Sequence, residues 1–550
     1  MPSLDSASLT IGKLFSEDYF FRVPEYQRPF SWDQDNLTDL VDDLTTARQT
    51  TDYFLGTLVL HKTAERTFDI VDGQQRLTAL CILLACIRDL AALADATDIR
   101  SQLQDKIIQP AKSLDNIPSR NRIEVRDSNV FNQMVGMQGG TTTYQPSGAV
   151  TPAESRYILA RDIFHERLKS FSAEEAEGLA KYIFQHCVII FLTATDFEEA
   201  FRLFTIVNDR GKQLRRIDII KARNIAPNVI IDDDARRRYA NRWETMEESL
   251  GETNFEDLFY LLRLIYIRDK PQADLLREFE TRIFNQPGKP TPGKSFIDEL
   301  EIYVKLYEEL FVDFDYLDAT SDGIKFRTLI SAMVWQFSAS EWRACVLAYA
   351  RKFGTTGLYE YILGIEKVYL THWVSGMRKD ERYSVYTDLL KSMDTGRYRE
   401  AIKATTEKSD PKAIQEACLV GNFYTSGYSK YLLLRAEILA SELDHAREFN
   451  VRSVEHVLPQ NPNTNSEWCK NFSPQDIDAV VNTAGNLVLL SKSKNSSASN
   501  REFKDKKTSY LQPRVSDFPR SMQVLSEPAW TRTVIEERTK KFAESILNNP

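Results

Sequence analysis

A glutamate and a histidine stand side by side near the C-terminus, at the end of a short apolar segment. Glu455 and His456 are followed by Pro459, which stops regular strand pairing. Asn486 and Asn495 flank the next apolar run. A neutral imidazole suits the removal of a proton from water near neutral pH, and carboxylate and amide oxygens are ligands for a hard cation. Together these residue types predict metal-assisted hydrolysis of a phosphodiester.

A second group of polar residues stands at a predicted strand-to-helix junction near the N-terminus. Asp72, Gly73, Gln74, Gln75 and Arg76 follow the strand-like residues 67–71. The N–H groups at a helix N-terminus attract anions, and Gly73 permits a close backbone turn. Arg76 can donate two hydrogen bonds to phosphate oxygens. The two glutamines add hydrogen-bond donors and acceptors, and Asp72 is suited to position water or a metal. The junction is a candidate phosphate site; an ordinary capped turn is the alternative.

The elements that must position these residues are visible as periodic patterns. Residues 35–49 repeat apolar positions at helical spacing, and residues 53–61, 67–71 and 188–196 have the composition of strands. A long helix is predicted over 77–93, and the Gly/Thr-rich residues 136–150 predict a mobile loop. Residues from 226 to 430 are helical and aromatic-rich, which indicates core packing. Short strands and loops return after residue 451, so the fold class is predicted to be α+β.

Charge is unevenly distributed along the chain. The 550 residues carry a net charge of −9, which argues against a protein that coats nucleic acid over its whole surface. Residues 451–550 hold 14 Lys+Arg against 11 Asp+Glu, so the end of the chain is the more plausible place for DNA contact. Basic residues gather directly after the predicted metal motif: Lys492, Lys494, Arg501, Lys504, Lys506 and Lys507. These residues are predicted to bind the phosphates of DNA. The alternative is that they form a solvent-exposed face of a helix.

Several classes of protein are disfavoured by the composition. The six cysteines are scattered without a Cys-x-x-Cys spacing, which disfavours a thiolate zinc site or a disulfide framework. The N-terminus lacks a basic region followed by an apolar run, so no secretory signal is expected. Arg88 and Asp89 interrupt the longest apolar stretch, which is therefore no membrane span. We expect a cytoplasmic protein without a membrane partner.

The C-terminal residues resemble a known nuclease motif. The runs VEHVLPQ and GNLVLL, with an asparagine nine positions after Asn486, are similar to the ββα-metal (HNH) motif of RNA-guided CRISPR nucleases and of the C-terminal half of the GmrSD restriction family. The resemblance implies that His456 is the general base, Glu455 and Asn495 bind Mg²⁺ or Mn²⁺, and Asn486 holds the histidine loop. Glu455 stands where Asp is common, and Ser493 where some members have an acidic residue.

The N-terminal residues resemble the other half of the same family. The runs VPEYQRPFSW, GTLVL, DIVDGQQRLTAL and FTIVNDRGKQLRRIDIIK look like the N-terminal half of GmrSD-type proteins. That resemblance implies a ParB/sulfiredoxin-like fold that binds and hydrolyses a nucleoside triphosphate at the DGQQR loop, with Tyr26, Gln27 and Arg28 nearby. GTP, UTP, CTP and ATP all stay candidates. Tyr26 and Trp32 have the chemistry to stack on a base, but core packing is favoured for both.

These inferences combine into one predicted architecture. Residues 1–225 form the ParB-like nucleotide-binding and sensor domain, residues 226–425 a helical connecting region, and residues 426–550 the HNH-type nuclease domain. The function implied is an NTP-regulated, divalent-metal-dependent DNA endonuclease of antiphage defence that restricts foreign or modified DNA. A homodimer is expected, because two strands must be cut.

Two alternatives stay open at this point. The first is a nucleotide-gated DNA-binding switch in which the HNH-like domain only binds. The second is an abortive-infection effector that cleaves RNA, because a ββα-metal site attacks a phosphodiester and need not read the sugar.

Overall fold

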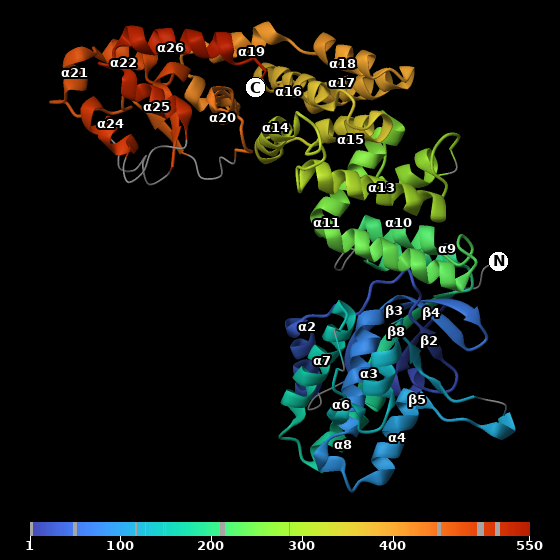
Figure 1. The fold of residues 1–550 in the computed structure, drawn as a ribbon. Coiled ribbons are helices and arrows are strands. Elements are labelled where there is room, and N and C mark those ends of the chain that lie inside the picture. Colours follow the sequence, from blue (N-terminus) through green and yellow to red (C-terminus); the bar gives the residue numbers. More distant parts are fainter. Residues whose placement is uncertain are drawn as a thin grey trace. The chain divides into compact units, whose positions relative to one another are not determined.

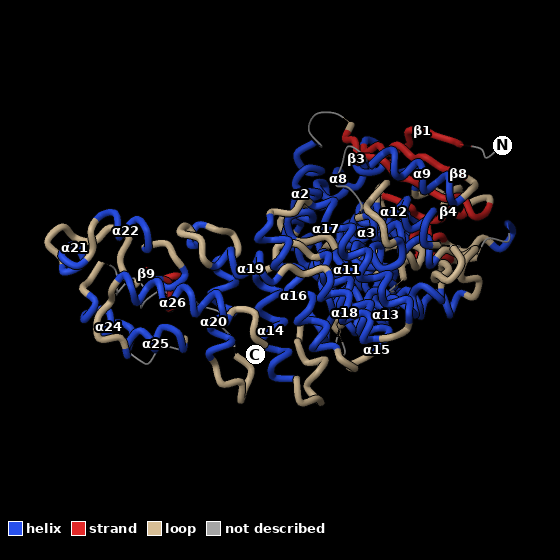
Figure 2. The backbone as a smooth tube through the Cα atoms, turned by 90° about the horizontal axis from the view of Figure 1, so that it is seen from above, coloured by secondary structure: helices blue, strands red, loops and turns tan. Residues whose placement is uncertain are grey.

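The protein was studied as a computed structural model, which describes the chain except residues 1–3, 48–51, 116–117, 127, 147, 149, 209–214, 285, 448–452, 492–499, 512–517 and 550. The chain folds into two compact units, Met1–Asn241 and Arg242–Pro550. The first unit combines a sheet with helices, and the second is mainly helical with a small sheet (Figure 2). The predicted α+β class is confirmed.

A six-stranded mixed sheet organises the first unit (Figure 1). Its strands are β1 (Leu4–Thr10), β2 (Phe20–Arg22), β3 (Tyr53–Ala64), β4 (Thr67–Asp72), β7 (Ile123–Glu124) and β8 (Cys187–Ala194). Their order is β1-β8-β3-β4-β2-β7, and β3 runs parallel to β8 but antiparallel to β4. In β8, Cys187, Ile189 and Phe191 are buried at alternate positions, as expected for a strand with one face on the core.

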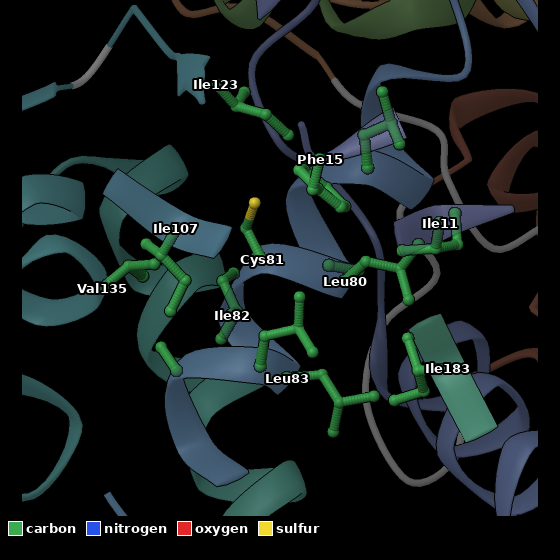
Figure 3. Packing of buried hydrophobic residues seen from close by; sticks show 14 of the residues in the cluster. Ile11, Phe15, Leu80, Cys81, Ile82, Leu83, Ile107, Ile123, Val135 and Ile183 are labelled. Atoms are coloured by element: carbon green, nitrogen blue, oxygen red, sulfur yellow. The ribbon is translucent and has the colours of Figure 1, made fainter. Parts of the chain in front are cut away.

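Helix α3 (Gln74–Arg88) lies at the centre of this unit. Every residue from Leu77 to Arg88 is buried, and a helix that is apolar on all sides must be covered on all sides. Figure 3 shows Leu80 to Leu83 of α3 among Ile11, Ile107 and Ile183. The helices of the unit are α1 (Ile11–Leu14), α2 (Gln34–Ala47), α4 (Thr97–Ile107), α5 (Ser128–Phe131), α6 (Gly140–Thr143), α7 (Pro152–Leu168), α8 (Ala173–His186), α9 (Phe197–Asn208) and α10 (Arg216–Ile225).

Helix α3 begins and ends earlier than the predicted helix over 77–93. Gly73 precedes it with a φ of 94°, and Gln74, Gln75 and Arg76 of the predicted strand-to-helix junction already form its first turn. At the other end, Arg88 and Asp89 form a fully buried ion pair of 2.7 Å, and the chain turns away there. Across the described residues, no helix has both the length and the apolar character needed to cross a membrane.

The buried ion pair also makes contacts with the Gly/Thr-rich segment predicted as a mobile loop over 136–150, in which residues Gly140–Thr143 form helix α6. Asp89 accepts hydrogen bonds from the backbone of Gly139 and of Thr141, at 2.9 and 3.1 Å. Arg88 donates to the carbonyl of Met137 at 2.7 Å. A composition rich in glycine suggests a loop, but it does not reveal a distant ion pair that satisfies the loop's backbone. Residues 147 and 149 lie outside the described part of the chain.

The first part of the second unit is helical, as predicted. Trp243, Phe255, Phe259 and Phe296 are almost completely buried and pack against one another, which confirms core packing for these aromatic side chains. The helices that begin before the C-terminal strands are α11 (Asp233–Ile267), α12 (Leu275–Glu278), α13 (Lys294–Phe311), α14 (Gly323–Gln336), α15 (Glu341–Phe353), α16 (Leu358–Ser375), α17 (Lys379–Ser392), α18 (Tyr398–Glu407), α19 (Pro411–Cys418) and α20 (Ser429–Ala440).

Two short antiparallel strands organise the end of the chain. Strand β9 (Ser453–His456) pairs with β10 (Leu487–Leu490), and His456 lies opposite Leu487. Val457, Trp468 and Trp530 belong to the small core packed around these strands. The surrounding helices are α21 (Glu467–Asn471), α22 (Pro474–Val480), α24 (Phe503–Leu511), α25 (Pro519–Ser526) and α26 (Arg532–Ser545).

Candidate functional site

A cavity of about 570 Å³ opens in the first unit where β4 ends and α3 begins. Small-molecule sites commonly have volumes of this order. All eight residues predicted to bind a nucleotide line this cavity, although the two groups are more than 40 positions apart: Tyr26, Gln27, Arg28, Asp72, Gly73, Gln74, Gln75 and Arg76. The fold therefore brings the two N-terminal motifs together at one place.

Gly73 lets the chain turn from β4 into α3 at the cavity wall. A Cβ atom at this position would lie 2.8 Å from the Cδ1 atom of Leu58, and the φ of 94° is strained for any L side chain. The N-cap residue of α3 is Gly73, which has no side chain to cap the helix. An uncapped helix N-terminus at a cavity wall suits an anionic ligand, because its N–H groups and dipole attract negative charge.

The glutamines of the two motifs hold the motifs together. Gln74 Nε2 donates to the carbonyl of Arg28 at 2.6 Å, and Gln75 Nε2 donates to that of Pro29 at 3.1 Å. Gln27 Nε2 donates in the opposite direction, to the carbonyl of Val71 at 2.6 Å. Each side-chain amide thus donates a hydrogen bond to a backbone carbonyl of the other segment. The structure places these glutamines as positioning residues of the cavity wall.

The charged residues described in the lining of the cavity are two arginines and three aspartates: Arg28, Arg76, Asp33, Asp72 and Asp218. Arg28 Nη2 lies 2.7 Å from a carboxylate oxygen of Asp218 on α10. Burial lowers the pKa of the Arg76 guanidinium below its usual value, and the charge of Asp72 acts in the opposite direction. A Cβ atom at Gly56 would lie 3.0 Å from Arg76 Nη1, so this glycine leaves room for the guanidinium. A guanidinium group can donate two parallel hydrogen bonds to the oxygens of one phosphate, so these arginines fit a polyphosphate ligand.

Asp218 was not among the predicted site residues. It lies in the run FTIVNDRGKQLRRIDIIK, which was noticed only as part of a resemblance. Phe201 and Phe204 of α9 complete the apolar side of the cavity. Tyr26 is only 4% exposed and packs edge-on against Phe197, so it forms part of the wall and does not offer a face for stacking. Residues 209–211, the end of the Asn-Asp-Arg-Gly turn, lie outside the described residues.

His456 ends strand β9 in the second unit and is partly buried. Its Nε2 lies 3.1 Å from Oδ1 of Asn482, and the ring of Tyr424 packs edge-on against the imidazole. Burial lowers the pKa of His456 to about 4; the hydrogen bond with Asn482 opposes that shift, and the charge of Lys506 adds to it. The imidazole is therefore neutral near neutral pH and can accept a proton. Asn482 is a site residue that the sequence did not reveal.

Asn486 fixes the loop that follows His456. Its side chain is fully buried and makes four hydrogen bonds: it accepts from the backbone of Leu458 and from Trp530, and it donates to the carbonyls of Leu458 and Val481, at 2.8 to 3.0 Å. An amide group can make no more. Asn486 therefore acts by positioning, the role that the resemblance implies for it. It lies in a short helical turn just before β10.

Glu455 forms a buried ion pair with Lys506. Lys506 Nζ lies 2.7 Å from Glu455 Oε1 and donates at 2.7 Å to the carbonyl of His456. The two side chains are 5% and 1% exposed. Successive residues of a strand point to opposite faces, so the carboxylate of Glu455 is directed away from the imidazole of His456.

The described residues do not by themselves form a cation site around Glu455. Its carboxylate is neutralised by an ammonium group, and no group of three or more His, Cys, Asp or Glu side chains in the described residues is placed to hold a metal. Asn495, the other predicted metal ligand, lies outside the described residues. Metal binding by Glu455 and Asn495 stays a prediction.

The predicted basic stretch divides into residues with different surroundings. Arg501 and Lys504 are exposed and can meet phosphates. Lys506 is buried, which corrects its assignment to a DNA-binding surface. Lys507 donates to the carbonyls of Leu525 and Glu527, so its ammonium group is also engaged inside the unit. Lys492 and Lys494 lie outside the described residues.

Two family models match the chain, one in its N-terminal part and one in its C-terminal part. A family model described as GmrSD restriction endonuclease, N-terminal domain, matches residues 11–225. A second, described as GmrSD restriction endonucleases, C-terminal domain, matches residues 408–545. A search of curated proteins finds no match. The first match contains the cavity of the first unit, and the second contains His456 and its neighbours.

Proposed function

Because this chain belongs to the GmrSD restriction endonuclease family, we propose that it cleaves DNA through His456 under the control of a nucleoside triphosphate bound in the N-terminal cavity. A restriction endonuclease role and DNA as the substrate follow from the family. The proposal adds the ParB-like character of the first domain, the HNH type of the second, NTP hydrolysis, dependence on Mg²⁺ or Mn²⁺, and selection of foreign or modified DNA.

One observation carries the nucleotide part of the proposal. Two motifs that are far apart in the sequence line a single cavity, which combines the uncapped N-terminus of α3 with two arginines. A triphosphate offers the negative charge that this wall attracts, and Arg28 and Arg76 provide paired donors. The apolar side of the cavity is suited to the base.

Nucleotide binding can be tested with matched arginine variants of the full chain. We expect Arg28→Met and Arg76→Met each to weaken binding of the preferred NTP about tenfold or more, because each removes a charge-assisted contact. The control is Arg66→Met, which removes an exposed arginine outside the cavity. Equal affinities for all three variants, measured by titration calorimetry, would reject the cavity as the nucleotide site.

The catalytic part of the proposal rests on the surroundings of His456. Asn482 orients a neutral imidazole, and Asn486 fixes the loop that follows it. These contacts support a general base that removes a proton from the attacking water. A divalent cation would supply charge stabilisation at the phosphate. For Glu455 to bind that cation, its carboxylate must give up the contact with Lys506.

Cleavage should be measured on a panel of DNAs with Mg²⁺ or EDTA and with or without each NTP. The panel contains unmodified plasmid and glucosylated, hydroxymethylated and phosphorothioated DNA, with an RNA arm for the alternative substrate. We expect His456→Ala to lose cleavage at least about a hundredfold, because a general base contributes on that order. His445→Ala, at an exposed histidine of the same unit, should cleave normally. Cleavage by a clean His456→Ala preparation would reject the assignment.

The Glu455–Lys506 ion pair favours one second candidate, a nucleotide-gated switch that binds DNA without cutting it. In that case the C-terminal domain would keep its fold but would have no carboxylate available for a cation. NTP-dependent DNA binding with no cleavage of any member of the panel, in Mg²⁺ or Mn²⁺, would support this function over the nuclease.

A further inference from the structure

The helical part of the second unit contains a cavity that the proposed nuclease and nucleotide sites do not use. It has a volume of about 400 Å³ and is lined mainly by residues of α11, α13 and α15 and by the loop 287–289. Four of its lining residues are cationic and one is acidic: Arg268, Lys289, Arg351, Lys352 and Asp394.

The two arginines of the cavity are already paired. Arg268 Nη1 lies 2.5 Å from Asp394, and Arg351 makes two contacts with Glu299 at 3.1 and 3.2 Å. Their charges are therefore balanced within the protein.

Among the described residues, the two lysines have no such partner. Lys289 Nζ donates to the carbonyl of Arg282, and Lys352 Nζ donates to the carbonyl of Met393, each at 2.7 Å. In the part of the chain that the structure describes, neither ammonium group forms an ion pair with a carboxylate. A carbonyl uses one of the three N–H groups of a lysine, so donors remain for a ligand. The cavity thus carries two positive charges that the described protein does not neutralise.

The surroundings of Lys289 make this charge costly without a ligand. Burial lowers the pKa of Lys289, and the nearby charges of Arg282 and Arg268 lower it further. A bound anion would replace that repulsion by attraction.

The backbone beside the cavity is strained at Arg268. This residue follows α11 with a φ of 54°, a conformation in which glycine is the usual residue at a helix end. Its N–H closes the helix on the carbonyl of Leu264 at 3.0 Å. The side chain held in this conformation lines the cavity and forms the ion pair with Asp394.

We infer that this cavity binds a phosphate group, and that Lys289 and Lys352 are its main ligands. The group belongs either to a free nucleotide or to the backbone of a nucleic acid, both of which present the same anionic oxygens. Two uncompensated ammonium groups match the charge of a phosphate, and the volume leaves room for more of the molecule than the phosphate alone. This site is separate from the N-terminal cavity, which belongs to the other unit.

The test uses the full chain with Arg28→Met as background, so that binding in the N-terminal cavity is weakened. The variant is Lys289→Met with Lys352→Met, which removes both charges and keeps the aliphatic stems. The control is Lys305→Met with Lys412→Met, which removes two exposed lysines of the same unit. The probes are pyrophosphate and a fluorescent DNA duplex, and urea unfolding checks that both variants are folded.

We expect the cavity variant to bind at least one probe about tenfold more weakly than the control variant. Weaker binding of pyrophosphate identifies a free phosphate compound as the ligand, and weaker binding of the duplex alone identifies the nucleic acid backbone. Equal binding by both variants, or no binding of either probe in this background, overturns the inference. Neither of these results affects the proposed function, which depends on Arg28, Arg76 and His456.

Discussion

The chemistry of His456 is determined by the atoms around its ring. Asn482 Oδ1 also accepts a hydrogen bond from Gln460 Nε2 at 3.1 Å, so it acts as an acceptor toward His456 Nε2 as well. The Nε2 atom then carries the proton, and Nδ1 is the atom left to accept one. This tautomer follows from the placement of the Asn482 amide.

The low pKa of His456 predicts an unusual pH dependence of cleavage. A base with a pKa of about 4 stays neutral in mildly acidic solution, whereas an ordinary histidine with a pKa of 6.5 would be protonated. We therefore expect the His456-dependent rate to be nearly constant from about pH 7.5 to about pH 5.5. Initial rates on the best DNA substrate would measure this. A rate that falls with an apparent pKa near 6.5 would contradict the burial argument.

The ion pair of Glu455 and Lys506 predicts strong coupling between two buried charges. Lys506→Met should lower the free energy of unfolding by about 3–5 kcal/mol, because it leaves a carboxylate buried without a partner. Adding Glu455→Gln should restore most of that loss. Urea unfolding of the two single variants and the double variant gives the coupling energy.

The control for that cycle is Lys504→Met, which removes an exposed lysine two positions away on the same helix. It should change the free energy of unfolding by less than about 0.5 kcal/mol. A double variant no more stable than Lys506→Met alone would show that the pair is not coupled in solution.

At the scale of elements, α3 connects the core of the first unit with its cavity. Most of the helix is buried on every side, and its N-terminus forms part of the cavity wall. Because the buried residues fix the axis of the helix, the N–H groups of its first turn are held in place before any ligand arrives. Such preorganisation reduces the entropy lost on binding.

Gly73→Ala should disturb the cavity as well as the fold. The positive φ and the contact with Leu58 should together cost about 1–2 kcal/mol of stability, and the displaced first turn should weaken NTP binding. Gly139→Ala is the matched control, because Gly139 also has a positive φ at a helix start but has open space around its Cβ position. We expect Gly139→Ala to lose stability and to keep its NTP affinity. Thermal unfolding and calorimetry separate the two effects.

At the scale of the whole molecule, the proposed functions belong to different units. The nucleotide residues lie within Met1–Asn241, and His456 lies within Arg242–Pro550. Single substitutions in the full chain should therefore separate the two activities. We expect His456→Ala to hydrolyse NTP at the wild-type rate, and Arg28→Met to lose the NTP dependence of cleavage. Loss of NTP hydrolysis by a folded His456→Ala protein would argue against this division.

Cleavage of both strands leads to a prediction about oligomeric state. Each chain supplies one His456, so two chains are needed to present a base to each strand at the same time. We expect light scattering to give twice the chain mass, at least when DNA and NTP are present. A monomer under all conditions would favour sequential nicking.

Local patterns in the sequence were enough to predict most elements and the main site motifs. The helix over 35–49 and the strands over 53–61, 67–71 and 188–196 correspond to α2, β3, β4 and β8. Periodicity and turn residues act over a few positions, so these elements can be inferred without knowledge of the fold. The same holds for the residue types of the DGQQR and Glu-His motifs.

The tertiary structure alone decided which side chains meet one another. Gln74 bonds the backbone of Arg28, 46 positions away, and Lys506 bonds Glu455, 51 positions away. These contacts give Gln74 a positioning role at the cavity wall and place Lys506, a predicted DNA contact, in a buried ion pair. Asp218 joins the site through its contact with Arg28. The physical reason is that a polar side chain takes its role from the partner that satisfies it when water is removed, and folding selects that partner from distant parts of the chain.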